Sequence, residues 1–471
     1  MKWQALILVA GAATLATAAH AAVTFEYLFD GGFPLAVSYD GSVIAGNSTY
    51  DYGAFRWTSA TGFVPLGRAS APVVGTSGGT PGLSADGRIV AATIHSDDST
   101  FVTAGVWSEA DGWTQIAPPV PPDGGIMDAN LADVWGLSGD GHVVVGLYWR
   151  PGSQGASAHA YRWTPEGGMV DLGVPGRSSR ANGASFDGSV IAGWQHHPSY
   201  GYRQPCVWRG TTQTLLGDID ANGEAQACSP NGEWVVGFQI NPVTHIREAT
   251  RWHWDGSAWS ATQFLGSVPG TFPSQGIAAA KAVSSDGSIV IGYSSPYGDP
   301  YYTTGFLWTA ATGCVDLEFW LADHDVFMDA DFDMRSLTCM TPDGQTLVGY
   351  GLKTTVPVAY RAFVVHWDHA YLAVAPPEPR PTATLAASPN PARAGTTLEF
   401  DLARAGSAAL DVLDLGGRVV RRVWSGPLAA GRQRLAWDGR DDAGTKVAPG
   451  LYFTRLVGEG TTVRGRVTVL D

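Results

Sequence analysis

The chain alternates short apolar runs with turn-forming residues, and one such pattern recurs along most of its length. An apolar or small residue is followed by Ser, any residue, Asp and Gly, and then by an apolar, mostly β-branched run. The pattern recurs seven times, at 37–41, 83–87, 137–141, 184–188, 228–232, 283–287 and 340–344, with Asn for Asp once and Thr for Ser once. Asp or Asn before Gly favours a tight turn between antiparallel strands, because Gly readily adopts a positive φ. The pattern therefore predicts seven β-hairpins.

A second strand pattern follows each hairpin and ends in tryptophan. The seven tryptophans are Trp57, Trp107, Trp163, Trp208, Trp252, Trp308 and Trp367. A shorter apolar strand comes next, as at 65–67, 171–173, 215–217 and 264–266. Four strands repeated at roughly 50-residue intervals are typical of propeller blades. We therefore predict an all-β, seven-bladed β-propeller of four-stranded blades over residues 22–374, with the tryptophans in its core because each buries a large apolar area.

Two segments compete for the fourth strand of the last blade. One is the segment 25–28, which precedes the first hairpin, and the other is the segment 371–374. Closure by the N-terminal segment would seal the first blade to the last and leave no open sheet edge. We prefer the N-terminal strand.

The pattern changes after a proline-rich segment at 375–383, which we interpret as a semi-rigid linker. Residues 384–471 contain short strands with alternating polarity, at 397–402, 408–414, 418–424, 433–437, 450–456 and 463–470. This pattern predicts a small immunoglobulin-like β-sandwich. We expect Trp437 and Tyr452 in its core and a turn at 438–439.

The first 21 residues have the pattern of a secretory signal peptide. Lys2 is basic, residues 5–15 are apolar or small, and Ala19 and Ala21 fit a small-x-small cleavage site. The apolar run is shorter than the roughly twenty residues of a spanning helix. We expect a mature protein that is secreted, extracellular or at the outer cell surface, without a membrane span. The alternative is an uncleaved N-terminal anchor.

Composition and charge narrow the possible partners. The chain has 60 Gly, 18 Trp and a formal net charge of -14. Nucleic-acid binders need a basic surface, so we expect no nucleic-acid partner. Disulfides are permitted in an exported protein, and Cys206–Cys228 and Cys314–Cys339 are the predicted pairs. Four buried free thiols are the equally open alternative.

One repeat carries a resemblance to a known family. Residues 159–164 read His-Ala-Tyr-Arg-Trp-Thr, and residues 168–173 read Gly-Met-Val-Asp-Leu-Gly. Together with the Ser-x-Asp-Gly turns, they resemble the bacterial extracellular HAF repeats over about 23–374, although other repeats lack the His, as before Phe55 and Phe306. The resemblance implies an exported propeller-like repeat protein without a settled activity.

The C-terminal segment carries a second resemblance. Its motifs are Ser-Pro-Asn-Pro at 388–391, the segment 412–421, Trp-Asp-Gly-Arg-Asp at 437–441 and the segment 447–453. They resemble the flagellar hook-capping-type immunoglobulin-like module and, equally, the C-terminal sorting domain of the type IX secretion machinery. The sorting resemblance implies the secretion machinery as a partner, and a plain spacer module is the alternative.

The sequence contains no recognisable catalytic motif, and we expect no enzyme activity, no cofactor and no metal. The densest run of carboxylates lies at 316–333. Its spacing does not match a calcium loop, so we favour a solvated loop with a short amphipathic helix formed by Leu317, Phe319, Trp320 and Leu321. Calcium binding by this stretch stays an open alternative.

The loops after the second strand of each blade are rich in aromatic residues. We predict a ligand-binding face there, with the candidate residues Tyr50, Tyr52, Tyr148, Trp149, Arg150, Trp194, His197, Tyr200, Tyr202, Tyr297, Tyr301 and Tyr302. Aromatic rings beside a few polar groups suit sugar rings or a protein surface. Local packing of the long loops against each other is the alternative.

Three classes of function therefore remain. A non-enzymatic binding or adhesion protein that presents this face to a glycan or an extracellular protein is preferred. A structural envelope-associated protein without a specific ligand comes second, and a carbohydrate-active enzyme third.

The binding hypothesis predicts that Trp149→Ala together with Trp194→Ala abolishes saturable binding without unfolding the protein. A structural protein would assemble regardless of both changes. An enzyme would lose turnover, but keep binding, when a single carboxylate is replaced.

Overall fold

The computed structural model describes residues 23–50, 53–68, 79–97, 102–116, 131–150, 157–218, 220–268, 277–295, 303–368, 385–393, 395–402, 405–414, 418–458 and 461–470. The chain divides into two compact units, 1–377 and 378–471. The division falls inside the segment predicted to be a linker. The predicted signal peptide, 1–21, lies outside the described residues.

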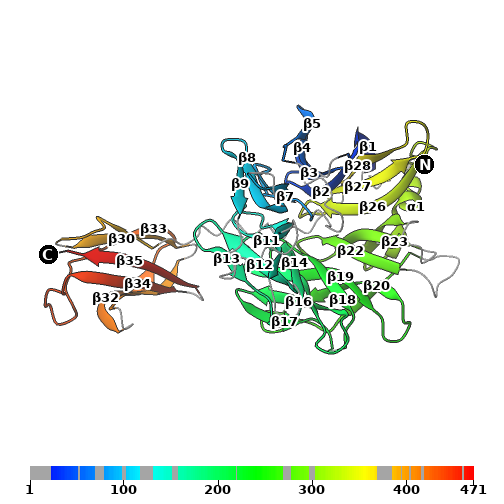
Figure 1. Ribbon diagram of the computed structural model, residues 1–471. Coiled ribbons are helices and arrows are strands. Elements are labelled where there is room, and N and C mark those ends of the chain that lie inside the picture. Colours follow the sequence, from blue (N-terminus) through cyan, green and yellow to red (C-terminus); the bar gives the residue numbers. More distant parts are fainter. Residues whose placement is uncertain are drawn as a thin grey trace, which may run out of the picture. The chain divides into compact units, whose positions relative to one another are not determined.

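The first unit consists of seven four-stranded antiparallel sheets, which confirms the predicted propeller (Figure 1). Blade 1 consists of β2 (Gly32–Val37), β3 (Val43–Ser48), β4 (Ala54–Thr58) and β5 (Gly62–Pro65). Blade 2 consists of β6 (Gly82–Leu83), β7 (Ile89–His95), β8 (Val102–Ser108) and β9 (Gly112–Ile116). Blade 3 consists of β10 (Ala132–Leu137), β11 (Val144–Arg150), β12 (Ser157–Thr164) and β13 (Gly168–Asp171). Blade 4 consists of β14 (Ser179–Ala184), β15 (Val190–His196), β16 (Arg203–Arg209) and β17 (Thr212–Leu215). Blade 5 consists of β18 (Gly223–Cys228), β19 (Trp234–Ile240), β20 (Arg247–His253) and β21 (Gln263–Gly266). Blade 6 consists of β22 (Ile277–Val283), β23 (Ile289–Ser295), β24 (Thr304–Thr309) and β25 (Gly313–Asp316). The first strands of neighbouring blades lie against one another and are the innermost strands.

Blade 7 combines both ends of the propeller sequence. It contains β26 (Phe332–Met340), β27 (Thr346–Lys353), β28 (Ala359–Trp367) and the N-terminal strand β1 (Val23–Asp30). β1 pairs antiparallel with β28, with Val23 opposite Trp367. The guanidinium of Arg361 also donates to Asp30, at 2.6 Å from Nε to Oδ1. The preferred N-terminal closure is therefore confirmed, while the competing segment 371–374 lies outside the described residues.

A serine or threonine hydroxyl fixes the turn between the first two strands of every blade. In blade 3, Ser138 Oγ donates to Asp140 Oδ1 at 2.5 Å and accepts from the backbone N–H of Val143 at 2.7 Å. The same two contacts recur in all seven turns, with Asn231 in blade 5 and Thr341 in blade 7. Each turn glycine has a positive φ, such as 75° at Gly141.

The turns also bind to one another, at the end of the propeller that we call the turn end. The backbone N–H of Tyr39 donates to Ala85 O at 2.9 Å, and that of Ala85 donates to Gly139 O at 2.7 Å. Further on, Phe186 donates to Pro230 O, and Ser285 donates to Pro342 O, both at 2.8 Å. The side chains of Tyr39 and Phe186, from blades 1 and 4, meet with ring centroids 5.8 Å apart. These contacts join the blades around the axis at the turn end.

The repeated tryptophans pack between blades. Trp208 and Trp252 are fully buried and Trp308 nearly so, as predicted for a core, while the other four are partly buried. The indole N–H of Trp208 donates to Leu172 O in the preceding blade at 3.0 Å. Arg56, just before Trp57, donates from Nε to Gly87 O in the next blade at 3.0 Å. The strand that ends in tryptophan therefore contacts neighbours on both sides.

The predicted short helix is present as α1 (Leu317–Ala322), between blades 6 and 7. Asp316 caps its N-terminus by accepting the backbone N–H of Glu318 at 2.8 Å. Leu317, Trp320 and Leu321 are buried in an apolar cluster with residues of blades 6 and 7, whereas Phe319 is exposed.

The second unit is a sandwich of two sheets. One is β29 (Ala386–Ser388), β30 (Thr396–Leu402) and β33 (Gly431–Trp437); the other is β32 (Val419–Leu428), β31 (Gly406–Leu413), β34 (Gly450–Gly458) and β35 (Thr461–Val469). Trp437 and Tyr452 are buried together in its core, and Gly439 has a φ of 73°, both as predicted. The carboxylate of Asp411 is buried between Arg422 and Arg455, each at 2.9 Å.

The turn hydroxyl should contribute measurably to stability. Ser138→Ala removes the acceptor of the buried Val143 N–H, so we expect the free energy of unfolding to fall by about 1–3 kcal/mol. Chemical denaturation of the two proteins measures the difference. Ser138→Thr is the matched control, because blade 7 has threonine at this position, and it should stay within about 1 kcal/mol of the original protein. Equal stability of the Ala variant would refute the role of the hydroxyl.

Candidate functional site

The predicted aromatic residues divide into exposed and buried groups. The loops after the second and fourth strands of each blade lie at the end opposite the turns, which we call the loop end. Tyr50, Trp149 and Tyr200 are exposed there, at 83%, 38% and 70% of their surface, and Tyr202 is partly exposed. These four stay candidates for contact with a ligand.

Three predicted site residues are instead buried. Tyr148 and Trp194 lie within strands β11 and β15, which extend further than the sequence pattern suggested. Tyr148 packs beside His159 and Tyr161, and Trp194 packs beneath the guanidinium groups of blade 4. The predicted exposure of these residues was wrong. Tyr148 is covered by apolar residues of blade 2, and Trp194 is covered by two arginines of its own blade.

His197 is the third buried residue, and its hydrogen bonds hold the conformation of the loop that follows β15. Its Nδ1 accepts the backbone N–H groups of Ser199 and Tyr200, at 3.1 and 3.2 Å. Its ring also stacks on Tyr200 and lies against Tyr202, with centroids 4.7 and 4.8 Å apart. Local packing, which was the alternative interpretation, therefore describes this loop.

The remaining predicted site residues lie outside what the structure describes. They are Tyr52, Tyr297, Tyr301 and Tyr302, together with the side chain of Arg150 at the end of β11.

All four cysteines are free thiols, so the predicted disulfide pairs are absent. Cys206 and Cys228 belong to blades 4 and 5, and Cys314 and Cys339 belong to blades 6 and 7. Each packs in a different apolar cluster. Burial raises the pKa of Cys228, Cys314 and Cys339 to about 12, which makes them poor nucleophiles.

A bulge in the innermost strands introduces polar side chains beside the propeller axis. In β18, Ala225 pairs with Gly237 and Ala227 with Val236, so Gln226 has no partner in the ladder. The bulged residues of blades 1 and 3 to 7 are Leu35, Trp135, Asn182, Gln226, Lys281 and Thr338, and blade 7 has a second bulge at Arg335. Bulges redirect side chains and are common beside functional sites.

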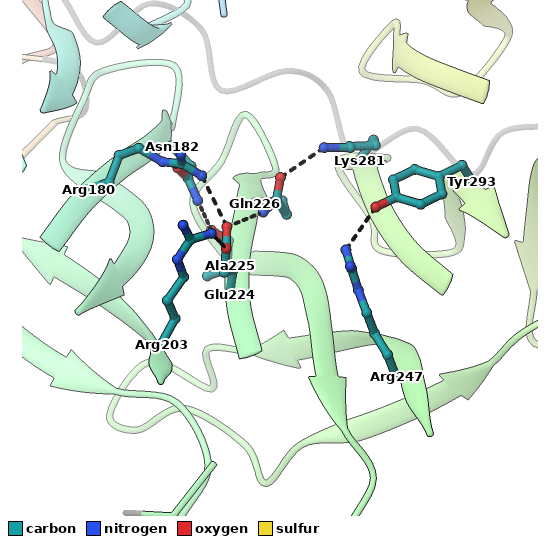
Figure 2. Close-up of polar contacts among 9 residues, drawn as sticks. All are labelled: Arg180, Asn182, Arg203, Glu224, Ala225, Gln226, Arg247, Lys281 and Tyr293. Atoms are coloured by element: carbon teal, nitrogen blue, oxygen red, sulfur yellow. Dashed lines mark hydrogen bonds and ion pairs between the residues drawn. The ribbon is translucent and has the colours of Figure 1, made fainter. Parts of the chain in front are cut away.

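Polar side chains of blades 4 to 6 form a connected group at the loop end of the axis, shown in Figure 2. We call it the axial cluster; its members are Arg180, Asn182, Arg203, Glu224, Gln226, Arg247, Lys281 and Tyr293. The buried carboxylate of Glu224 lies at its centre. It accepts from Arg180 at 3.1 Å, from Gln226 at 2.7 Å and from Arg203.

Further contacts extend the cluster across blades. Asn182 accepts from Arg180 Nε at 2.6 Å and donates to Ala225 O at 2.7 Å. Lys281 Nζ donates to Gln226 Oε1 at 3.0 Å. Arg247 donates to the hydroxyl of Tyr293 at 2.8 Å.

Aromatic faces cover the two arginines of blade 4. The guanidinium carbon of Arg180 lies 3.6 Å from the ring centroid of Trp135 and 5.4 Å from that of Trp194. The guanidinium of Arg203 lies 4.4 Å from the centroid of Trp194. Stacking on a ring holds the guanidinium plane in place, and the N–H groups at its edge can still donate hydrogen bonds.

Cations outnumber carboxylates in this cluster. Arg180 and Arg203 contact Glu224, Lys281 is attracted by it, and Arg247 lies beside Tyr293 (Figure 2). The buried Asp133 also attracts Arg180. Burial lowers the pKa of Lys281 to about 8 despite the attraction of Glu224, and lowers that of Arg180 to about 10. The excess of positive charge is local, because the whole chain carries a formal charge of -14.

Several donors of this region have no acceptor among the described residues. They are the indole N–H groups of Trp135 and Trp194 and the Nε of Arg247. Arg247 and Lys281 also form no ion pair with a described carboxylate. Buried donors without acceptors are costly, so these three groups make the region expensive to maintain for stability alone.

We also considered surface hollows, metal-ligating side chains and membrane-spanning helices among the described residues. One hollow in the first unit is lined by turn-end residues such as Trp234, Arg251 and Asp286, and one in the second unit by residues such as Trp437. Within the described ranges, His, Cys, Asp and Glu form no group that could hold a metal ion, including the acidic stretch 316–333. No described helix is long and apolar enough to cross a membrane.

Comparison with known proteins supports the domain division. Residues 389–460 match the family model of the FlgD Ig-like domain. No curated protein matches the chain.

Several solved structures are similar to the propeller. The β-propeller domain of the Trilobed protease from Pyrococcus furiosus is 11% identical with a TM-score of 0.42, covering 74% of this chain and 100% of that one. The β-propeller domain of Myceliophteria thermophila Cps50 (Swd1) is 12% identical with a TM-score of 0.43, over 74% and 100%. TolB from Acinetobacter baumannii is 18% identical with a TM-score of 0.33, and the match spans 50% of this chain but 56% of TolB. These values support no statement about function.

The axial cluster was not predicted from the sequence. Asn182, Gln226 and Lys281 share one position in the repeat, three residues before the turn serine. Large polar residues within otherwise small, apolar innermost strands were the available signal. Arg203 and Arg247 begin the third strands. Arg203 directly follows the aromatic loop residues Tyr200 and Tyr202, whereas Arg247 had no comparable signal.

Burial separates the two tryptophans that were predicted to act together. Trp194→Ala should lower the free energy of unfolding by about 3–5 kcal/mol, because it removes a buried indole. Trp149→Ala should change it by less than about 1 kcal/mol, because that side chain is partly exposed on the surface. Urea denaturation of both variants tests this. Equal destabilisation would contradict the placement of Trp149.

The depressed pKa of Lys281 predicts a pH-dependent stability. Between about pH 8 and the ordinary lysine pKa of about 10.4, the unfolded chain holds a proton that the folded protein releases, so stability should rise with pH. Lys281→Met removes this contribution. The variant should therefore exceed the original protein in stability below pH 8, and this advantage should shrink toward pH 10. Denaturation of both proteins across this range measures it, and a constant difference would contradict the prediction.

Proposed function

We propose that this protein is a secreted or cell-surface, non-enzymatic binding protein whose ligand approaches the loop end of the propeller. The axial cluster carries the proposal. Four cationic side chains from three blades belong to one cluster that holds a single carboxylate, which is buried, and nearby donors have no acceptor among the described residues. A group of this kind is costly to maintain for stability alone, since buried charges seldom stabilise a fold as well as apolar residues do.

The surroundings of the cluster support binding. Tyr50, Trp149 and Tyr200 are exposed at the same end of the propeller and offer flat apolar surfaces there. The opposite end is occupied by turns that bond to one another and by the contact of Tyr39 with Phe186. A ligand is therefore better accommodated at the loop end.

The proposed location rests on the two ends of the sequence. Residues 1–21 have the pattern of a signal peptide, and the repeats resemble the extracellular HAF repeats. The FlgD Ig-like match over 389–460 agrees with the resemblance to a hook-capping-type module. We propose that this unit also serves as a sorting domain for the type IX secretion machinery, on the motifs at 437–441 and 447–453.

A glycan array probed with the purified protein tests the binding function. We expect saturable binding that weakens at least about tenfold in Trp149→Ala, because an exposed indole contributes on the order of 1.4 kcal/mol to a contact. Phe453→Ala is the matched control, since Phe453 is similarly exposed but lies in the second unit. The control should bind like the original protein.

The alternatives give different results. The protein could show no saturable binding on the array and yet stay in a cell-envelope fraction. That result would indicate a structural function and contradict the binding function. Consumption of a bound glycan would indicate an enzyme.

A further inference from the structure

The geometry points to the chemical class of the ligand, on the basis of the proposed binding function. We propose that the axial cluster binds the carboxylate or sulfate group of an acidic glycan. Guanidinium groups donate in pairs to the oxygens of such groups, and an ammonium group adds a point charge. The cluster offers both kinds of donor within one small region.

Two cations of the cluster, Arg247 and Lys281, are not paired with its carboxylate. Glu224 already accepts from Arg180, Arg203 and Gln226. Arg247 and Lys281 have only neutral acceptors, namely Tyr293 Oη and Gln226 Oε1. Neither cation forms an ion pair with a described carboxylate, although Glu224 attracts Lys281 from a greater distance. An anionic group placed between them would supply the missing charge.

These two cations are also held in place without a ligand. The guanidinium carbon of Arg247 lies 3.6 Å from the ring centroid of Phe238 and 5.8 Å from that of Tyr293. Lys281 Nζ lies 5.8 Å from the same tyrosine ring. Figure 2 shows the lysine directed toward Gln226 and the arginine directed toward the hydroxyl of Tyr293. Such preorganisation lowers the entropic cost of binding.

The cluster is reachable from solvent. The side chain of Arg203 is 46% exposed, whereas those of Arg180 and Glu224 are 11% and 4% exposed. Arg247, Lys281 and Tyr293 are half-buried. A partly covered cationic group is where an anion gains most, because screening by water and salt is weaker there.

The exposed aromatic residues favour a glycan as the carrier of the anion. Tyr50 and Trp149 offer ring faces on the same end of the propeller, and pyranose rings stack on such faces. A nucleic acid is disfavoured by the charge of -14 on the whole chain.

Calorimetric titration of the full chain with three oligosaccharides tests the inference: an oligogalacturonate, a sulfated galactan fragment and the neutral galactan fragment of equal length. We expect the acidic ligands to bind at least about tenfold more tightly than the neutral one, which corresponds to about 1.4 kcal/mol. Lys281→Met and Arg247→Gln should each reduce this preference about tenfold. Inorganic sulfate, tested alone by thermal shift, shows whether the cluster binds the free anion.

The control is Arg88→Gln, which removes one positive charge at the turn end. Arg88 is 82% exposed and belongs to the turn of blade 2. It should bind like the original protein. Unfolding curves of the three variants confirm that losses arise from the site, and Lys281→Met is expected to fold at least as stably as the original.

Several outcomes would overturn the inference. Equal binding of neutral and acidic galactans that Lys281→Met leaves unchanged would refute the anionic ligand while keeping the proposed binding function. Tighter binding of an oligoglutamate peptide than of either acidic glycan would make the ligand an acidic protein. Absence of binding by all three oligosaccharides and by sulfate would refute the site. Absence of binding to the whole glycan array would separately refute the binding function.

A pH series provides a second readout. The groups that face Lys281 are Gln226 and Glu224 from β18, Arg180 from β14, Arg247 from β20 and Tyr293 from β23. Because the pKa of Lys281 is about 8 in the free protein, affinity for oligogalacturonate should fall as the pH rises from 7 to 9. The fall should be absent in Lys281→Met. An identical pH profile in both proteins would remove Lys281 from the site.

Discussion

The fold depends on one hydroxyl group in each blade. Ser138 and its six counterparts hold the turn between the two innermost strands by accepting a backbone N–H and donating to the turn carboxylate or amide. Because the turns also donate to one another around the axis, the same group sets where each blade meets the next. The innermost strands are then held in register, and their bulges fall at one level beside the axis.

In the innermost strands, the paired residues are similar from blade to blade, whereas the bulged residue varies. The residues on either side of the bulge are mostly small and pack between strands, as Ala225 and Ala227 do. The bulged residue is outside the ladder, so it is free to be Leu35 in blade 1, Gln226 in blade 5 or Lys281 in blade 6. The scaffold therefore accepts chemical diversity at one position per blade without disturbing the hydrogen bonds that define it.

The sequence was sufficient for the fold because its signals are local. A turn between adjacent strands is encoded by a few neighbouring residues, and the strands follow from the runs beside it. The axial cluster is not local, since Arg180, Glu224 and Lys281 lie in different blades and meet only after the propeller closes. Sequence position also misplaced Trp194 in a loop and paired Cys206 with Cys228, because neither strand length nor the boundary between blades is visible in spacing alone.

The closing strand has a consequence for how the molecule is assembled. Asp30 and its partner Arg361 are separated by 331 positions, so β1 stays unpaired while nearly the whole propeller is synthesised. The entropic cost of joining such distant segments grows only with the logarithm of their separation, by about 0.6 kcal/mol for each doubling. Equilibrium stability is therefore little affected, but the final step is delayed, as is usual when distant segments must pair. Until that step, the last blade presents an open edge to any other extended chain nearby.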